Sequence, residues 1–156
     1  MQEDGDIQAN LHGTALALGD RGVLIRGPSG SGKSDLALRV LALRPGPLVP
    51  QQPMLIADDR VLVVRRTGVL FLDCPNTIIG LIEVRGVGIM RVPSIAAARL
   101  VLVIDLMGQD DVPRMPEAGA EVEICGVPVH HVRLAPFEQS APLKLVLAIE
   151  NVPVSL

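Results

Sequence analysis

The residues best suited to chemistry lie near the start of the chain, in a stretch that fits the phosphate-binding pattern G-x-x-x-x-G-K-S/T without a mismatch. In such a loop the backbone N–H groups turn toward phosphate oxygens, and the positive end of the following helix adds to the attraction. The lysine would reach the β- and γ-phosphates, and the hydroxyl would ligate Mg²⁺. The alternative is a glycine-rich turn that binds nothing. We expect nucleotide phosphate to be bound by Gly27, Pro28, Ser29, Gly30, Ser31, Gly32, Lys33 and Ser34.

Phosphoryl transfer also needs carboxylates, one to hold Mg²⁺ and one to take the proton of the acceptor. Asp58 and Asp59 follow the apolar run 54–57, where two carboxylates are costly unless they bind metal, pair with a cation or face water. One would act as the base while the other holds the metal. The pair is equally compatible with a solvated turn in which Arg60 is the partner.

Three further positions could complete such a site. Glu83 and Arg85 flank Val84, so in a strand both point to one face and could bind metal and phosphate together. An ordinary surface ion pair explains the same pattern more simply. His12 precedes a strand and Arg114 lies in a loop. A lone histidine is more often structural, and a loop arginine is usually solvated.

Asp105 ends an apolar run, where many nucleotide-binding proteins place an acid that ligates Mg²⁺ through water, although a helix cap or a loop acid fits as well. His130 and His131 are adjacent in a predicted strand. Their side chains must therefore point to opposite faces, and we interpret both as structural.

The elements that must position these residues are mostly strands. Apolar runs and turn residues predict strands at 14–18, 21–26, 54–57, 61–64, 69–72, 82–86, 100–106, 121–125 and 128–134. Helical spacing predicts a helix at 35–43 and another at 143–149, the second with Leu143, Leu147 and Ala148 as its apolar face. The proline-rich segment 44–53 excludes regular structure.

The length of 156 residues suits one domain, for which we expect a loose tail at 1–10 and a single P-loop kinase domain at 11–156. With 49% hydrophobic residues the chain is globular. Its net charge of −3 and the lack of a basic run exclude a nucleic-acid face. Phe71 and Phe137 are the only aromatic residues, so a nucleotide base would rest on aliphatic side chains or backbone.

Cys74 and Cys125 show neither metal-ligand spacing nor a disulfide framework, which favours buried, reduced thiols. The acidic start of the chain is not typical of a signal peptide, and no apolar run approaches the length of a membrane span. We therefore expect a soluble, cytoplasmic protein with no membrane partner.

These motifs together resemble the catalytic domain of HPr kinase/phosphorylase, which acts on a seryl residue of HPr, the phosphocarrier of the bacterial phosphotransferase system. The resemblance covers about residues 11–149. It rests on Leu11-His12-Gly13, the phosphate loop, Ile56-Ala57-Asp58-Asp59 and, most specifically, the run Ile82–Ile89, which is close to the family signature. It implies a compact, strand-rich α/β P-loop domain that is similar to phosphoenolpyruvate carboxykinase rather than to doubly wound nucleotide kinases.

The resemblance also implies roles for particular residues. The acceptor serine would be activated by Asp58 or Asp59, and the same acid would protonate the leaving group in the reverse reaction. ATP would be the donor, bound by the phosphate loop and Arg85. Mg²⁺ would be held by Ser34, Glu83 and Asp59. The catalytic set implied by the family is Asp58, Asp59, His12, Lys33 and Arg114.

We therefore expect an ATP- and Mg²⁺-dependent serine kinase for HPr or an HPr-like carrier, with phosphorylase activity as a further implication of the family. The family also implies a homo-oligomer, a hexamer. The alternative is a nucleotide-binding sensor that transfers nothing and reports to a two-component sensor kinase. Its motivation is that the chain stops soon after Ile149, where longer members continue with a helix. A small-molecule kinase is disfavoured, because no arginine-rich lid follows the loop.

Overall fold

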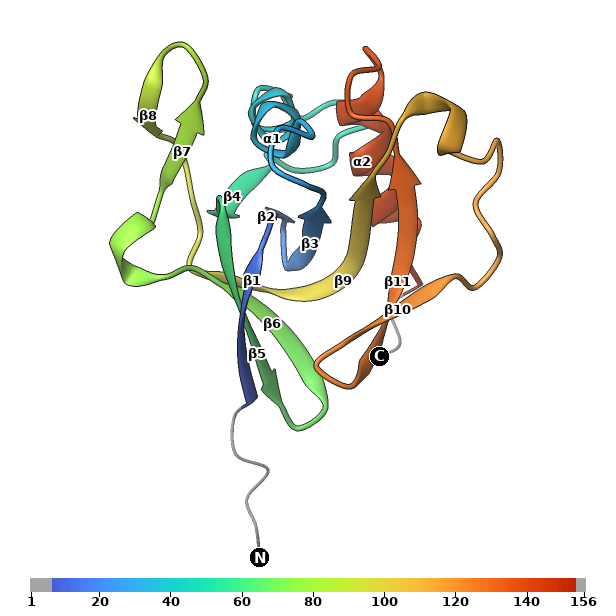
Figure 1. Ribbon diagram of the computed structural model, residues 1–156, viewed down its shortest axis with the longest axis horizontal. Coiled ribbons are helices and arrows are strands. Elements are labelled where there is room, and N and C mark those ends of the chain that lie inside the picture. Colours follow the sequence, from blue (N-terminus) through green and yellow to red (C-terminus); the bar gives the residue numbers. More distant parts are fainter. Residues whose placement is uncertain (1–6, 154–156) are drawn as a thin grey trace, which may run out of the picture.

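The computed structural model describes residues 7–153. It contains a nine-stranded mixed sheet (Figure 1). Seven of the strands follow the order β1-β5-β6-β9-β3-β2-β4, and the other two are β11, which pairs with β9, and β10, which pairs with β11. The strands of this sheet are β1 (Ile7–His12), β2 (Thr14–Leu18), β3 (Arg21–Arg26), β4 (Met54–Ala57), β5 (Arg60–Arg66), β6 (Val69–Asp73), β9 (Ala97–Leu106), β10 (Glu121–Ile124) and β11 (Val127–Leu134).

The remaining elements lie around this sheet. A separate two-stranded hairpin stands beside the first helix, with which its first strand is in contact (Figure 1). These elements are the hairpin strands β7 (Leu81–Val84) and β8 (Gly88–Arg91), the helices α1 (Lys33–Leu41) and α2 (Ala141–Glu150), and the short 3₁₀ turns η1 (Asn76–Ile78) and η2 (Gln109–Asp111).

Strand β9 is the centre of the sheet. It pairs in parallel with β3 and β11 and antiparallel with β6. Residues 100–104 of β9 are buried, as expected for a continuous apolar run in a strand that is covered on both faces. Because β3, β9 and β11 run in the same direction, their carboxyl ends meet at one edge, where open α/β sheets bind ligands.

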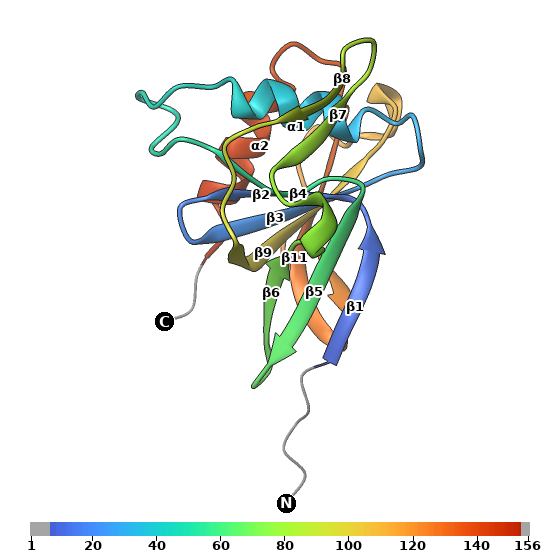
Figure 2. The ribbon, with the colours of Figure 1, turned by 90° about the vertical axis from the view of Figure 1, so that its left-hand side faces the viewer.

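Helices α1 and α2 cover one face of the sheet, and β1, β5 and β6 curl below the other (Figures 1 and 2). Alternation along β9 places Leu102 and Ile104 in the cluster under the helices and Val103 in the cluster on the opposite face. In α1, Leu36 and Val40 are one turn apart and both lie in the helix-side cluster. The apolar spacing of the sequence is therefore what fixes α1 against the sheet.

The sequence-based strands and both helices are confirmed, apart from a few differences. The strand expected at 82–86 ends at Val84, so Arg85 lies in the turn that leads to β8, a strand that the sequence did not predict. Strand β1 begins at Ile7, so residues 7–10 belong to the sheet instead of a tail, while residues 1–6 lie outside the described part of the chain. The polar residues of β1 hid this strand, whose partner is β5. The predicted apolar face of the second helix is confirmed for Leu143 and Ala148, which pack against the core, but was wrong for Leu147. Leu147 is 46% exposed, whereas Leu145 and Val146 are buried against the sheet.

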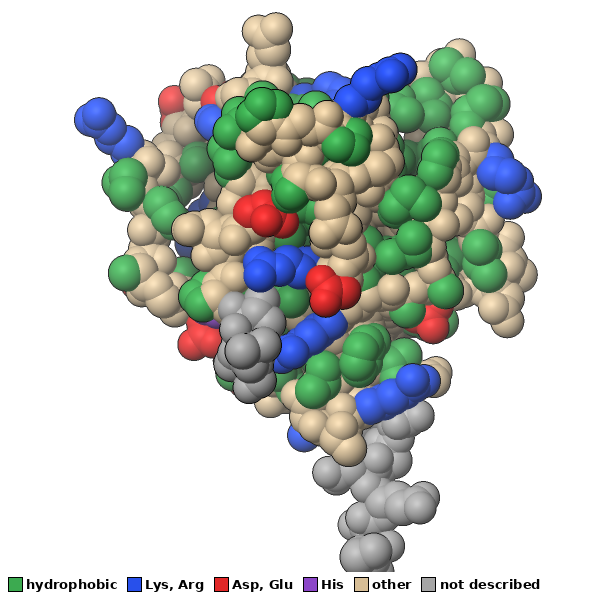
Figure 3. Space-filling view, turned by 180° about the vertical axis from the view of Figure 1, so that it is seen from behind, with side chains coloured by type: hydrophobic (Ala, Val, Ile, Leu, Met, Phe, Trp, Pro, Cys, Tyr) green, Lys and Arg blue, Asp and Glu red, His purple; other side chains and the backbone are tan. Residues whose placement is uncertain are grey.

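The surface shows no segregation of charge on the face seen from behind, where acidic and basic side chains are interspersed (Figure 3). Within residues 7–153, neither helix is long and apolar enough to cross a membrane.

Candidate active site

The phosphate loop joins β3 to α1 at the edge where the parallel strands end. Gly30 and Gly32 have φ values of 80° and 97°, in the left-handed region that glycine enters without strain. The Ser31 N–H donates to the Pro28 carbonyl at 3.0 Å and closes the turn. The free N–H groups at the start of α1 therefore face the loop, as anion binding requires.

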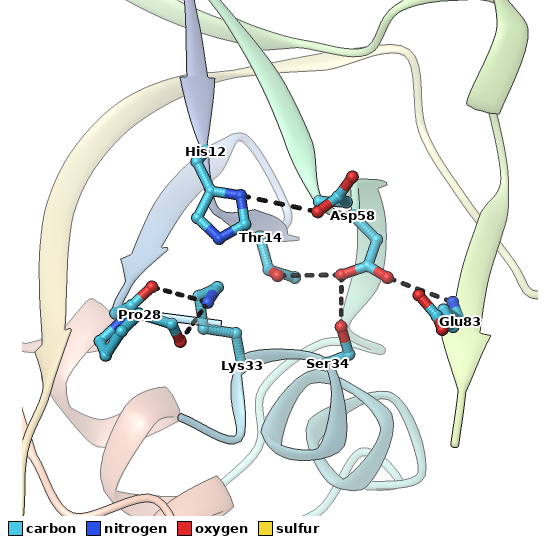
Figure 4. A network of polar contacts seen from close by, with 9 residues as sticks. His12, Thr14, Pro28, Lys33, Ser34, Asp58 and Glu83 are labelled. Carbon is cyan, nitrogen blue, oxygen red and sulfur yellow. Dashed lines mark hydrogen bonds and ion pairs between the residues drawn. The ribbon is translucent and has the colours of Figure 1, made fainter. Parts of the chain in front are cut away.

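Lys33 lies inside this loop and is only 7% exposed. Its Nζ donates to the carbonyl of Gly27 at 2.7 Å and to that of Pro28 at 2.9 Å (Figure 4). Burial lowers the pKa of Lys33, and the negative charges of Asp58 and Asp59 oppose that shift. A phosphate oxygen would accept from the same ammonium in place of the loop carbonyls.

Asp58 is buried at 5% exposure and connects three elements (Figure 4). Its Oδ1 accepts hydrogen bonds from Thr14 Oγ1 at 2.9 Å and Ser34 Oγ at 2.8 Å, and its Oδ2 accepts one from the Glu83 N–H at 3.2 Å. These bonds join β2, α1 and β7 at one point. Asp58 therefore has the surroundings of a residue that positions its neighbours.

Asp59 has different surroundings, although it is the next residue. Its φ of 71° turns the backbone, a conformation that Asp tolerates better than most residues. The Gly13 N–H donates to the Asp59 carbonyl at 3.2 Å and fixes this turn against β1. The Asp59 side chain is 70% exposed, with Oδ1 3.5 Å from His12 Nδ1. Of the two carboxylates, that of Asp59 is the one open to solvent.

A hollow of about 550 Å³ brings most of the predicted residues together. Its walls come from the phosphate loop, from the β1 end, from the turn after Asp58 and from the β7–β8 hairpin. The predicted residues that line it are His12, Ser29, Gly30, Gly32, Lys33, Ser34, Asp59, Glu83 and Arg85. Arg114 is not among them, because it lies between η2 and β10 and lines a different hollow together with His131 and Lys144.

The donor groups of this hollow fit Mg²⁺. Ser34 Oγ donates its proton to Asp58, which leaves its oxygen lone pairs free for a cation. The carboxylate of Glu83 lines the same hollow and is exposed. Among residues 7–153 no three His, Cys, Asp or Glu side chains are grouped as a metal site. Ser34 and Glu83 would supply one hydroxyl and one carboxylate, and Mg²⁺ usually takes one or two protein carboxylates and completes its shell with water and substrate phosphates.

Sequence reasoning missed two residues of this site. Thr14 is buried and donates to Asp58; a single hydroxyl in an otherwise apolar strand was the available signal. Phe137 lines the hollow from the loop between β11 and α2. The signal for Phe137 was its position directly after a parallel strand. Asp105, in contrast, is bound by Arg26 and His131 and does not line this hollow.

The fold and the site define a class: P-loop domains with a mixed, strand-rich sheet and a carboxylate pair beside the phosphate loop. The model of the HPr Serine kinase C-terminal domain matches residues 6–150, so the chain belongs to that family.

Curated relatives agree with this assignment. A protein of Variovorax paradoxus named HPr kinase/phosphorylase is 31% identical over 137 residues, which are 80% of this chain and 40% of that protein. One of Bordetella pertussis with the same name is 34% identical over 135 residues, 80% of this chain and 41% of that protein. The chain therefore spans about two fifths of the length of these relatives.

A solved structure supports the fold. The Hpr(Ser) kinase/phosphatase from Coxiella burnetii superposes with a TM-score of 0.76 at 23% identity, covering 92% of this chain and 95% of the other. The compact, strand-rich α/β P-loop architecture expected from the sequence is thereby confirmed.

Proposed function

We propose that this domain transfers the γ-phosphoryl group of ATP, in the presence of Mg²⁺, to a serine of HPr or an HPr-like carrier. The observation that supports the proposal most directly is the exposed carboxylate of Asp59 in one hollow with Lys33 and Ser34. Family membership and the names of the curated relatives point to the same reaction.

In the proposed reaction the serine oxygen attacks the γ-phosphorus, its proton passes to Asp59, and the bond to the β-phosphate oxygen breaks to release ADP. His12 lies 3.5 Å from Asp59 and orients its carboxylate. Lys33 and Arg85, which both line the hollow, hold the phosphates. Mg²⁺, held by Ser34 and Glu83, would neutralise charge on the phosphate oxygens.

Asp58 has a different role in this proposal. Its hydrogen bonds to Ser34 and to the Glu83 N–H place both proposed Mg²⁺ ligands relative to the phosphate loop. Such partners of metal ligands often matter nearly as much as the ligands themselves. The sequence left open which acid is the base, and the geometry favours Asp59.

The test is incubation of the protein with purified HPr, Mg²⁺ and ATP labelled at the γ-position. We expect label on HPr serine and none on a matched HPr in which the acceptor serine is alanine. ATP binding without transfer to HPr would refute the kinase and support the sensor.

The same preparation, given serine-phosphorylated HPr and inorganic phosphate, should release pyrophosphate if the family's reverse reaction is retained, with the Asp59 carboxyl returning the proton.

A further inference from the structure

A second hollow of about 470 Å³ lies beside the phosphate loop, at the carboxyl ends of the three parallel strands. Its walls are Pro28 and Ser31 after β3, the segment 106–109 at the end of β9, and the segment 135–138 after β11. The crevice outside the carboxyl ends of parallel strands is the usual ligand position in open α/β sheets. This hollow contains no acid that could take part in transfer except Glu138, which is paired with Lys144.

Phe137 connects this second hollow with the proposed transfer site, because its side chain lines both. The ring lies directly over Gly32, where an added Cβ would be 3.0 Å from the ring. It is 73% exposed. Isolated exposed apolar side chains are common on proteins, so the exposure alone has no meaning. What distinguishes Phe137 is an open aromatic face next to the backbone that would bind phosphate.

The turn that carries Phe137 is fixed to the same helix that begins in the phosphate loop. Arg39 of α1 donates to the Pro136 carbonyl and, at 3.4 Å, to the Glu138 carbonyl, one on each side of the ring. Lys144 Nζ holds the Glu138 carboxylate at 2.6 Å. The backbone on both sides of Phe137 is therefore held against α1 before any ligand binds, which reduces the entropy lost on binding.

The second hollow also contains a polar group in need of a partner. Ser31 Oγ is buried at its wall and, within residues 7–153, has no hydrogen-bond partner. Buried hydroxyls are nearly always hydrogen-bonded in folded proteins. The hydroxyl lies against Gly27, and rotation of the Ser31 side chain toward the hollow would let a ring nitrogen or an exocyclic group of a ligand satisfy it.

From these observations we propose that Phe137 is the platform on which the base of the donor nucleotide stacks, with the ring system in the second hollow and the phosphates in the loop. This rests on the proposed function for the identity of the donor. It differs from the expectation that a base would rest on aliphatic side chains or backbone. Its consequence is that the nucleoside, and not only the phosphate chain, contributes to affinity.

The first experiment compares ATP with inorganic tripolyphosphate, each with Mg²⁺, by calorimetric titration of the full chain. Phe137→Ala should weaken ATP binding by about 10- to 100-fold, the range for loss of one base–aromatic stack, and change tripolyphosphate binding less than twofold. Phe137→Tyr keeps the ring and should restore ATP affinity. Equal weakening of both ligands would overturn the proposal, because the ring would then only support the loop, and so would no change in either.

The second experiment uses the fact that the chain has no tryptophan. Phe137→Trp introduces a single reporter, whose fluorescence ATP should quench by stacking while tripolyphosphate does not. Phe71→Trp in β6 is the matched control and should respond to neither. Quenching by both ligands alike, or by neither, contradicts a base platform.

The two proposals can fail separately. Phe137-dependent ATP binding without transfer to HPr supports the platform and refutes the kinase. Transfer to HPr with unchanged ATP affinity in Phe137→Ala does the reverse. A wild-type protein that binds neither ATP nor tripolyphosphate overturns both.

Discussion

Two aspartates occupy similar positions at the same edge of the sheet and have very different partners. Asp58 follows β4 and Asp105 lies near the end of β9, and the pairings of β4 with β2, β2 with β3 and β3 with β9 bring both ends to one side. Asp58 accepts hydrogen bonds from two hydroxyls and one amide, all of them neutral. Asp105 accepts two from Arg26, both at 2.9 Å, and contacts His131 at 2.8 Å.

The difference lies in what happens to the negative charge. Burial alone would raise the pKa of Asp105, but the hydrogen bonds and charges of Arg26 and His131 outweigh it and hold that pKa below its usual value. Its charge is therefore neutralised locally. Within residues 7–153 Asp58 has no hydrogen-bonded cation of this kind, and its charge acts on Lys33 in the loop. An acid at a strand end can thus serve the site or the framework, and its partners decide which.

The largest loss of phosphoryl transfer should follow from replacing Asp59, the exposed neighbour of Asp58. Asp59→Asn removes the proposed base, so phosphoryl transfer to HPr should fall by about 10²- to 10⁴-fold, the usual contribution of a general base. Because the Asp59 side chain is mostly exposed, nucleotide binding and the unfolding midpoint should stay close to wild type. Steady-state transfer and ATP titration measure the two quantities.

The matched control is Asp20→Asn, an exposed aspartate in the turn at the other end of β3, which should leave the rate unchanged. Equal loss of ATP affinity and rate in Asp59→Asn would mean that Asp59 holds the metal or the fold. Asp58 would then be the better candidate for the base.

Asp58→Asn should have a smaller effect on rate and a larger one on structure. An Asn oxygen can still accept from Thr14 and Ser34, but its NH₂ group would then face the Glu83 N–H, donor against donor. We expect the Mg²⁺-dependent affinity for ATP to fall by about 10- to 100-fold. The unfolding free energy should fall by about 1–3 kcal/mol, the cost of leaving a buried polar group unsatisfied. Full retention of the Mg²⁺-dependent ATP affinity would mean that Asp58 does not position the Mg²⁺ ligands.

The sequence predicted the phosphate loop, because Gly30, Gly32 and Lys33 act through local backbone geometry that a short motif encodes. It could not separate Asp58 from Asp59, since their roles depend on the positive φ of Asp59 and on hydroxyls from distant elements. The strand β1 was missed for the same reason: its residues are polar, and its pairing with β5 is a long-range contact. A local motif could therefore be predicted from the sequence, whereas contacts between residues far apart in the sequence could not.

Asp105→Asn tests whether Asp105 stabilises the fold without taking part in phosphoryl transfer. It removes the charge that Arg26 and His131 share, and Arg26 is about one third exposed, so solvent recovers part of the loss. We expect the unfolding free energy to fall by about 2 kcal/mol in urea titrations. Transfer to HPr and ATP affinity should stay within about twofold, because Asp105 does not line the transfer hollow. A large loss of Mg²⁺-dependent binding without loss of stability would instead make Asp105 a ligand of the metal through water.

The smallest expected effect is on the pH dependence of the unfolding free energy, which also tests the role of Asp105 in stability. The pKa of Asp105 is lower in the folded chain than the value of about 3.9 of an unfolded aspartate. The ionised carboxylate therefore stabilises the fold fully above that unfolded value, and this contribution is lost as the pH falls through the lowered folded pKa. The difference in unfolding free energy between wild type and Asp105→Asn should hold down to about pH 5 and shrink below about pH 4, as urea titrations at a series of pH values would show. A difference that changes mainly above about pH 5 would contradict the assignment of this pH dependence to the Asp105 carboxyl.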